Sequence, residues 1–177
     1  MATIYTIGHS TRTFDELVRV LKAHDISTLL DIRAFPMSRR MPHFNRESLE
    51  VELPKHGIAY VSMKELGGRR KKIRNDSPNN GLRNDSFRNY ADYMLTEEFA
   101  EGIERLLGIA AEGNTAIMCA ERLYFQCHRM LVSDYLTSRG HIVLHIDDDK
   151  RPLREHKLMA EARVVDGRLI YDAQELF

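Results

Sequence analysis

The sequence has few cysteines, no long apolar run and no net charge. Its 177 residues include only two cysteines, Cys119 and Cys127, which are too few for a disulfide framework. No apolar run approaches the roughly 20 residues of a membrane helix, and the start MATIYTIGHS lacks the features of a signal peptide. We therefore expect a reduced, cytoplasmic protein without a membrane partner, whose thiols bind a metal, react or are simply buried.

Charge is balanced over the whole chain, with 26 basic and 26 acidic residues, so no global field indicates a nucleic-acid or membrane partner. The distribution is uneven, because residues 67–85 carry six basic side chains against two acidic ones. This segment is also rich in glycine, asparagine and proline. It is either a solvated surface loop or a basic lid that closes over an anionic ligand.

Short β-branched runs alternate with segments of helical periodicity, and Thr13 with Glu16 forms a capping box before one such segment. This alternation predicts an α/β fold. We expect a single three-layer domain over residues 1–177, with a mostly parallel sheet of about five strands and helices on both faces. The five expected strands are residues 3–8, 27–33, 58–63, 115–120 and 141–146.

Turn signals mark the C-terminal part of the chain. Gly140 stands where a helix would end before the fifth strand. Asp166 and Gly167 separate two apolar runs, which predicts a short hairpin over residues 162–171. A last helix is expected around residues 153–160.

Polar residues follow each expected strand, at the edge where open α/β sheets bind ligands. Asp31 and Glu121 interrupt apolar strand ends, and a buried carboxylate needs a partner, for which Arg33 and Arg129 are the candidates. The pattern predicts a functional site, with a purely structural ion-pair network as the alternative. The residues at this edge are Gly8, His9, Ser10, Asp31, Arg33, Gly67, Gly68, Cys119, Glu121, His145 and Asp147.

The loop after the second expected strand carries three arginines, Arg33, Arg39 and Arg40. Pro36 and Pro42 hold this loop in extended conformations. Because the planar guanidinium matches phosphate and carboxylate, we expect an oxyanion site here. Arg40 fits an exposed surface position better than Arg33 does.

Three interpretations of the two cysteines stay open. Cys119, Cys127 and His128 resemble a ligand set, but the spacing of a structural zinc site is missing. Cys127 near a helix start and beside Arg129 favours a reactive thiolate, although Phe125 stands where a Cys-x5-Arg phosphate cradle would need arginine. Cys119, within the apolar run AIMCA, fits a buried strand residue.

Several motifs together resemble the family catalogued as domain of unknown function 488: TIGHST, LLDIR followed by FPMSRR, ELGGRR, YADYM, and MCAE followed by CHR. The resemblance covers nearly the whole chain. It implies a compact α/β domain with this polar set, and no particular reaction. The characteristic residues are Gly8, His9, Ser10, Asp31, Arg33, Pro36, Ser38, Gly67, Gly68, Cys119, Glu121, Cys127, His128 and Arg129.

The sequence therefore predicts an enzyme acting on a phosphate-bearing small molecule or nucleic acid. Glu121 or Asp31 is the expected general acid or base, and Cys119 or Cys127 the expected nucleophile. The alternatives are a module that binds anions or nucleic acid without chemistry, and a Cys/His metal site. The expected binding residues are Gly8, His9, Ser10, Arg33, Ser38, Arg39, Gly67, Gly68, His128 and Arg129.

Overall fold

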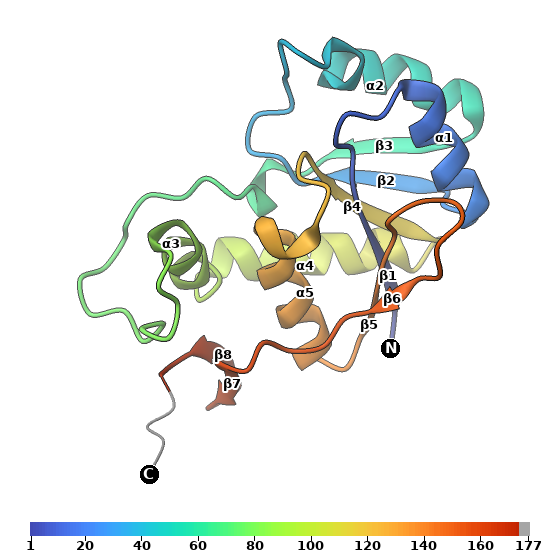
Figure 1. Cartoon of the computed structure of the whole chain (residues 1–177). Coiled ribbons are helices and arrows are strands. Elements are labelled where there is room, and N and C mark those ends of the chain that lie inside the picture. Colours follow the sequence, from blue (N-terminus) through green and yellow to red (C-terminus); the bar gives the residue numbers. More distant parts are fainter. Residues whose placement is uncertain (174–177) are drawn as a thin grey trace.

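The computed structural model describes residues 1–173 and contains a six-stranded sheet in the order β3-β2-β4-β1-β5-β6 (Figure 1). The first five strands in this order are parallel, and β6 is antiparallel to β5. The strands are β1 Thr3–Gly8, β2 Thr28–Asp31, β3 Ala59–Ser62, β4 Thr115–Cys119, β5 Ile142–His145 and β6 Arg154–Glu155. The α-helices are α1 Phe14–Ala23, α2 Arg46–Glu52, α3 Asp85–Tyr93, α4 Glu97–Ala110 and α5 Arg129–Ser138. Four short 3-10 helices cover Pro42–Phe44, Leu53–His56, Lys64–Leu66 and Tyr124–Gln126.

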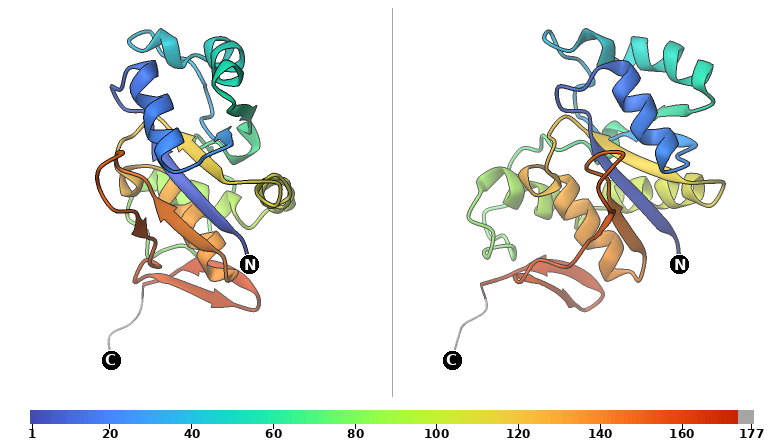
Figure 2. Two further views of the ribbon diagram at one scale, coloured as in Figure 1. Left: turned by 90° about the vertical axis from the view of Figure 1, so that its right-hand side faces the viewer. Right: turned by 45° about the vertical axis from the view of Figure 1, so that its right-hand side comes forward.

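Helices cover both faces of the sheet, as Figure 2 shows from two sides. Alternate strand residues point to opposite faces, so Ile7 packs in the cluster that includes Leu17 and Leu49 of α1 and α2. Ile4 packs in the other cluster, against residues of α3, α4 and α5 such as Leu131. The predicted three-layer α/β fold is therefore confirmed. No helix in the described part of the chain is long and apolar enough to cross a membrane.

Local sequence signals explain where the elements begin and end. The Thr13 side chain accepts a hydrogen bond from the Glu16 amide, and the Glu16 carboxylate accepts one from the Thr13 amide, which confirms the capping box of α1. Gly140 has φ +85° after α5, as expected for a helix end. The hairpin of β7 Ala162–Val165 and β8 Arg168–Tyr171 is also confirmed, with positive φ at both Asp166 and Gly167.

The helix expected around residues 153–160 is wrong. Arg154 and Glu155 instead form the edge strand β6, which pairs with His145 and Leu144 of β5. The next residue, His156, is buried and hydrogen bonded to other elements. Pairing across the sheet edge therefore overrides the local pattern of this segment.

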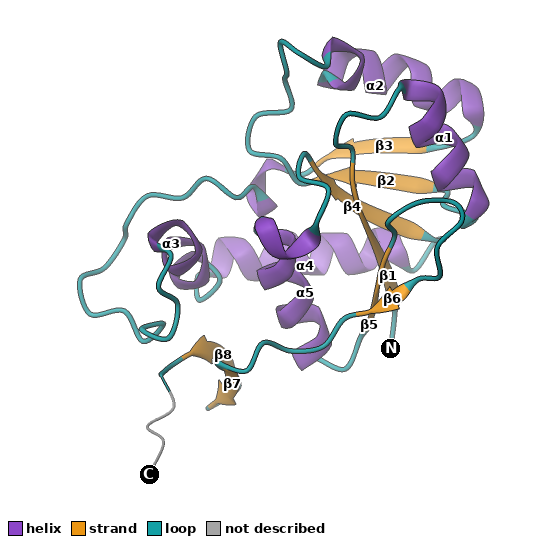
Figure 3. Cartoon of the chain, viewed as in Figure 1, coloured by secondary structure: helices purple, strands orange, loops and turns teal. Residues whose placement is uncertain are grey.

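The basic segment forms a long connection without helix or strand between Leu66 and Asp85 (Figure 3). Residues 71–76 are exposed. The following residues are held by the buried Asp92, whose Oδ1 accepts hydrogen bonds from Ser77 and Asn79 at 2.5 and 2.7 Å. At its other end Arg70 stacks over the ring of Tyr93, 3.6 Å from its centroid, so both ends of the segment contact α3 while residues 71–76 face solvent.

A close backbone contact fixes the end of β1. Gly8 pairs with Cys119 of β4, and a Cβ at position 8 would lie 1.8 Å from the carbonyl oxygen of Glu121. Only glycine allows the chain after β4 to cross β1 at this distance. The crossing places the loop 121–127 directly beside the end of β1.

We predict that Gly8→Ala lowers the free energy of unfolding by about 3 kcal/mol, because the backbone of residues 121 and 122 must move. Gly108→Ala is the matched control, since a Cβ there meets nothing within 4 Å. This control should raise stability by about 0.5–1 kcal/mol. Urea unfolding measures both changes. Equal stability of Gly8→Ala and the parent protein would contradict the close contact.

Candidate functional site

A pocket of about 670 Å³ lies beyond the carboxyl ends of β1, β2 and β4. The expected site residues on its wall are His9, Arg33, Ser38, Gly68, Cys119, Glu121, Cys127 and His128. Five further residues line it that were not among the expected site residues, although three of them lie in the quoted motifs FPMSRR and YADYM: Phe35, Met37, Phe87, Tyr90 and Gln126. Phe35 and Met37 are 65% and 71% exposed. Two large apolar residues in a loop, in the stretch AFPM, were the sequence signal that could have identified them as pocket residues.

The other expected site residues lie behind the wall or away from it. Gly8 and Gly67 occur where chain segments touch, since a Cβ on Gly67 would lie 2.8 Å from Cα of Ala34. Asp31 and Arg129 are buried. The remaining two are Ser10, which has φ 49°, and Arg39, which is exposed.

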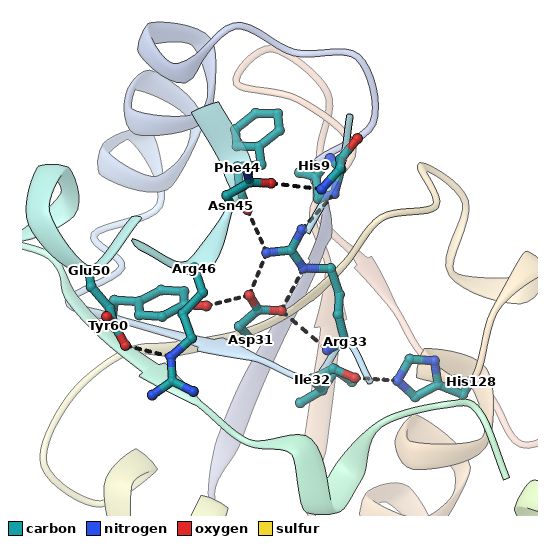
Figure 4. A network of polar contacts seen from close by, with 11 residues as sticks. His9, Asp31, Ile32, Arg33, Phe44, Asn45, Arg46, Glu50, Tyr60 and His128 are labelled. Atoms are coloured by element: carbon teal, nitrogen blue, oxygen red, sulfur yellow. Dashed lines mark hydrogen bonds and ion pairs between the residues drawn. The ribbon is translucent and has the colours of Figure 1, made fainter. Parts of the chain in front are cut away.

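The pairing predicted between Asp31 and Arg33 is confirmed (Figure 4). Nε and one terminal nitrogen of Arg33 donate to the two carboxylate oxygens of Asp31 at 2.8 and 2.6 Å. The same guanidinium donates to the carbonyl of Phe44, and Tyr60 donates its hydroxyl to Asp31 at 2.5 Å. Burial and the Asp31 charge raise the pKa of Tyr60, so it stays protonated. Asp31 and Arg33 therefore neutralise each other inside the protein.

Two histidines on the pocket wall are neutral at pH 7. Burial lowers the pKa of His9 to about 4, and Arg33 adds to this effect. Burial also lowers the pKa of His128 to about 4. Because a carbonyl only accepts, His128 donates from Nε2 to Ile32 and keeps Nδ1 as an acceptor. This Nδ1 lies against Gly68, where a Cβ would be 2.4 Å away.

The two free cysteines form a sulfur pair on the pocket wall, with 2.9 Å between the Sγ atoms. The hydrogen bond from Cys119 lowers the pKa of Cys127 to about 6, with help from Arg129 and against the effect of burial. Burial raises the pKa of Cys119. At neutral pH the Cys119 thiol thus donates to a Cys127 thiolate. Cys127 is also the more accessible of the two, at 9% against 3% exposure.

Arg129, at the start of α5, is the buried cation behind this thiolate. Its backbone amide and Nε donate to Cys127 Sγ at 3.4 and 3.3 Å. The predicted ion pair with the Glu121 carboxylate is wrong, because Arg129 binds the main-chain carbonyls of Glu121 and Arg122. The Glu121 side chain stays exposed, where its charge is solvated at little cost. The backbone of the loop therefore surrounds the Arg129 guanidinium, and the carbonyl oxygens of Glu121 and Arg122 accept its hydrogen bonds.

A buried chain of hydrogen bonds extends from this site and was missed in the sequence. Thr6 Oγ1 is 2.7 Å from His145 Nδ1, His145 Nε2 is 2.9 Å from His156 Nδ1, and His156 Nε2 is 2.7 Å from Asp134 Oδ1. Tyr171 donates to the other oxygen of Asp134 at 3.0 Å. The available signal was Asp134 itself, a carboxylate in the middle of the apolar run MLVSDYL.

The donor set does not support the metal alternative. Residues 1–173 contain no group of three or more His, Cys, Asp or Glu side chains placed to hold a metal ion. His128, the expected companion of the two sulfurs, uses Nε2 to bind Ile32. The sulfur pair is therefore better described as a dithiol than as half of a metal site.

A comparison with known families gives one match. The family model described as Domain of unknown function DUF488 matches residues 13–136. The chain belongs to this family. The resemblance found in the sequence is thereby confirmed, and the DUF488 match includes both cysteines, Asp31, Arg33 and Arg129. No curated protein and no solved structure matches the chain.

We predict that Asp31→Asn lowers the free energy of unfolding by about 3–5 kcal/mol, because it leaves the Arg33 charge buried without its partner. Glu50→Gln is the control: it removes the exposed ion pair with Arg46 and should change stability little. Urea unfolding at pH 7 measures both. If Asp31→Asn proved no worse than Glu50→Gln, the pair would not be an obligatory part of the buried structure.

We also predict the pH dependence of alkylation at Cys127. Iodoacetamide reacts with the thiolate, so the rate at Cys127 should rise with pH, reach half of its maximum near pH 6 and then level off. Cys119→Ala removes a hydrogen bond to the thiolate and should move the midpoint upward, towards the ordinary value of about 8.5. Mass spectrometry of the two cysteine peptides gives each rate. A midpoint near 8.5 in the parent protein would disprove the thiolate.

Proposed function

We propose that this chain is a thiol-dependent enzyme in which Cys127 is the nucleophile and Cys119 the resolving thiol. The observation that carries this proposal is the pair of free sulfur atoms 2.9 Å apart on the pocket wall. The thiolate is the reactive form of cysteine, and hydrogen bonds from Cys119 and Arg129 favour it at Cys127. A second thiol within reach allows a covalent sulfur adduct to be released as an internal disulfide.

The proposed reaction is thiol–disulfide exchange with a small organic disulfide. The Cys127 thiolate attacks one sulfur of the substrate, forms a mixed disulfide and displaces the other half as a thiolate. That leaving thiolate takes the proton of Cys119, which lies beside the reacting sulfur. Cys119 then attacks Cys127 Sγ, so that the internal disulfide forms and the second half leaves as a thiolate. The substrate gains two electrons, the protein dithiol loses two, and an external dithiol reductant restores the protein.

The charge of the pocket supports a substrate with little net charge. Arg33 is neutralised by Asp31, and Arg129 by the Cys127 thiolate. His9 and His128 add no charge at pH 7, because burial lowers the pKa of each to about 4. A phosphate would therefore meet few unpaired cations on this wall.

The phosphate-bearing ligand predicted from the sequence is the second candidate. Arg69 supports it, because this exposed arginine lines the pocket and belongs to the basic segment 67–85. Glu121 lies on the same wall and is exposed, so it would serve as the general acid or base there. Asp31 is less suited to that role, since Arg33 and Tyr60 occupy both of its oxygens.

We predict that hydroxyethyl disulfide converts the parent protein to its internal disulfide and yields two thiol products per chain. Cys119→Ser should stop at a mixed disulfide on Cys127, because no resolving thiol is present. Cys127→Ser should lose the reaction by at least about 100-fold, because Cys119 is buried and protonated. Intact-protein mass spectrometry distinguishes the three states.

Two outcomes would overturn this proposal. One is a Cys127→Ser variant that reacts as fast as the parent protein. The other is a parent protein that ignores the disulfide but hydrolyses p-nitrophenyl phosphate with dependence on Glu121, which would establish the second candidate. Binding of phosphate without any turnover would favour the non-catalytic module instead.

A further inference from the structure

We infer that a second pocket, separate from the thiol pocket, binds a small amphipathic anion: one or two aromatic rings that carry a carboxylate, sulfonate or phosphate. The pocket has a volume of about 290 Å³ and is bounded by residues 122–125 on one side and 145–154 on the other. The two walls have no residue in common, but the buried Arg129, whose Nε donates to Cys127 Sγ, also lines this second pocket. The donors of Arg129 are used within the protein, so the ligand proposed here would bind the exposed residues of the wall.

The wall offers an apolar surface for a ring. Leu123 and Phe125 remain 37% and 45% exposed at its edge. Tyr124 is fixed between them by stacking on the buried His145, with ring centroids 3.6 Å apart and planes 2° from parallel. Leu153 contributes a further apolar side chain. Exposed apolar groups around a hollow are typical of a ligand site, and this volume suits a compact ligand.

The mouth of the pocket carries excess positive charge. Three exposed arginines, Arg122, Arg151 and Arg154, line it together with one carboxylate, Asp147. Asp147 pairs with Arg122 at 3.1 Å and with Arg151 at 2.5 Å, while Arg154 has no carboxylate partner among residues 1–173. The guanidinium group matches anionic oxygens with two parallel hydrogen bonds. Arg151 also pairs with Asp148 at 3.4 Å. An anion would thus complete the coordination of Arg154 and share Arg151 with these two carboxylates.

These two properties define the ligand class. An inorganic anion would leave the exposed ring of Phe125 and the half-buried ring of Tyr124 unused, and a neutral ring would leave Arg154 unpaired. An aromatic ring that carries an anionic group contacts the apolar side chains and pairs with Arg154 at the same time. The thiol pocket differs in this respect, because the buried arginine on its wall, Arg33, is already neutralised by Asp31.

The test is a fluorescence titration of the full chain with anilinonaphthalene sulfonate, an aromatic anion. We expect saturable binding that Arg154→Gln weakens by about tenfold, since it removes one charge-assisted contact. Arg168→Gln is the matched control, because Arg168 is also an exposed strand arginine but lies on the hairpin. Arg151→Gln serves as a second variant of the pocket, and urea unfolding verifies that each variant is folded.

Competition defines the chemistry further. Benzoate should displace the probe, whereas benzyl alcohol, of the same shape without the charge, should be at least about tenfold weaker. Equal binding by Arg154→Gln, Arg151→Gln and Arg168→Gln would overturn the inference. So would loss of binding in Phe35→Ser alone, because the probe would then occupy the thiol pocket. Neither result would bear on the proposed exchange reaction, which is measured at the sulfurs.

Discussion

The buried guanidinium of Arg129 is the interaction on which the site depends. The side chain is only 1% exposed, and a buried charge is tolerated only when its hydrogen bonds are satisfied. Its partners come from three parts of the chain: the carbonyls of Glu121 and Arg122 in the loop, the Cys127 sulfur before α5, and Thr6 on β1. The buried guanidinium must be neutralised and its donors must be satisfied. The Cys127 thiolate supplies the negative charge, and the path of loop 121–127 supplies the carbonyl oxygens. The same loop is also held by its close backbone contact with Gly8 at the end of β1.

Much of the fold could be predicted because its signals are local. The capping box at Thr13 and the turn at Asp166 and Gly167 specify structure within a few residues, and the strand runs show burial directly. The failure at residues 153–160 is of a different kind. That segment has no strong signal of its own, and its conformation is decided by pairing with β5 and by the contact between His156 and Asp134. Contacts between residues so far apart in sequence are not visible in a pattern of apolar spacing.

The candidate site was predicted in its location but only partly in its contacts. Polar residues after parallel strands converge by topology, and Asp31 with Arg33 could be paired because they are two residues apart. Arg129 was assigned to the wrong partner. Residue types reveal which side chains carry charge, but the path of a loop decides which main-chain carbonyls are available, and no side-chain pattern encodes that. The sulfur pair depends equally on this path, since it brings Cys127 back to Cys119.

Burial also decides what each arginine is able to bind. Arg33 and Arg129 are the most suggestive anion ligands in the sequence, yet they are 6% and 1% exposed and their donors are used within the protein. An incoming phosphate would have to displace a carboxylate or carbonyl and leave it unsatisfied, which is costly in a buried site. Arg154 is exposed and carries no such cost. Arg129 borders the second pocket as well, but its donors are already used by the loop carbonyls and the Cys127 sulfur. The cations free to bind an incoming anion are therefore exposed ones, Arg69 on the thiol pocket and Arg154 on the second pocket. Burial thus assigns one arginine to the sulfur and leaves anion recognition to others.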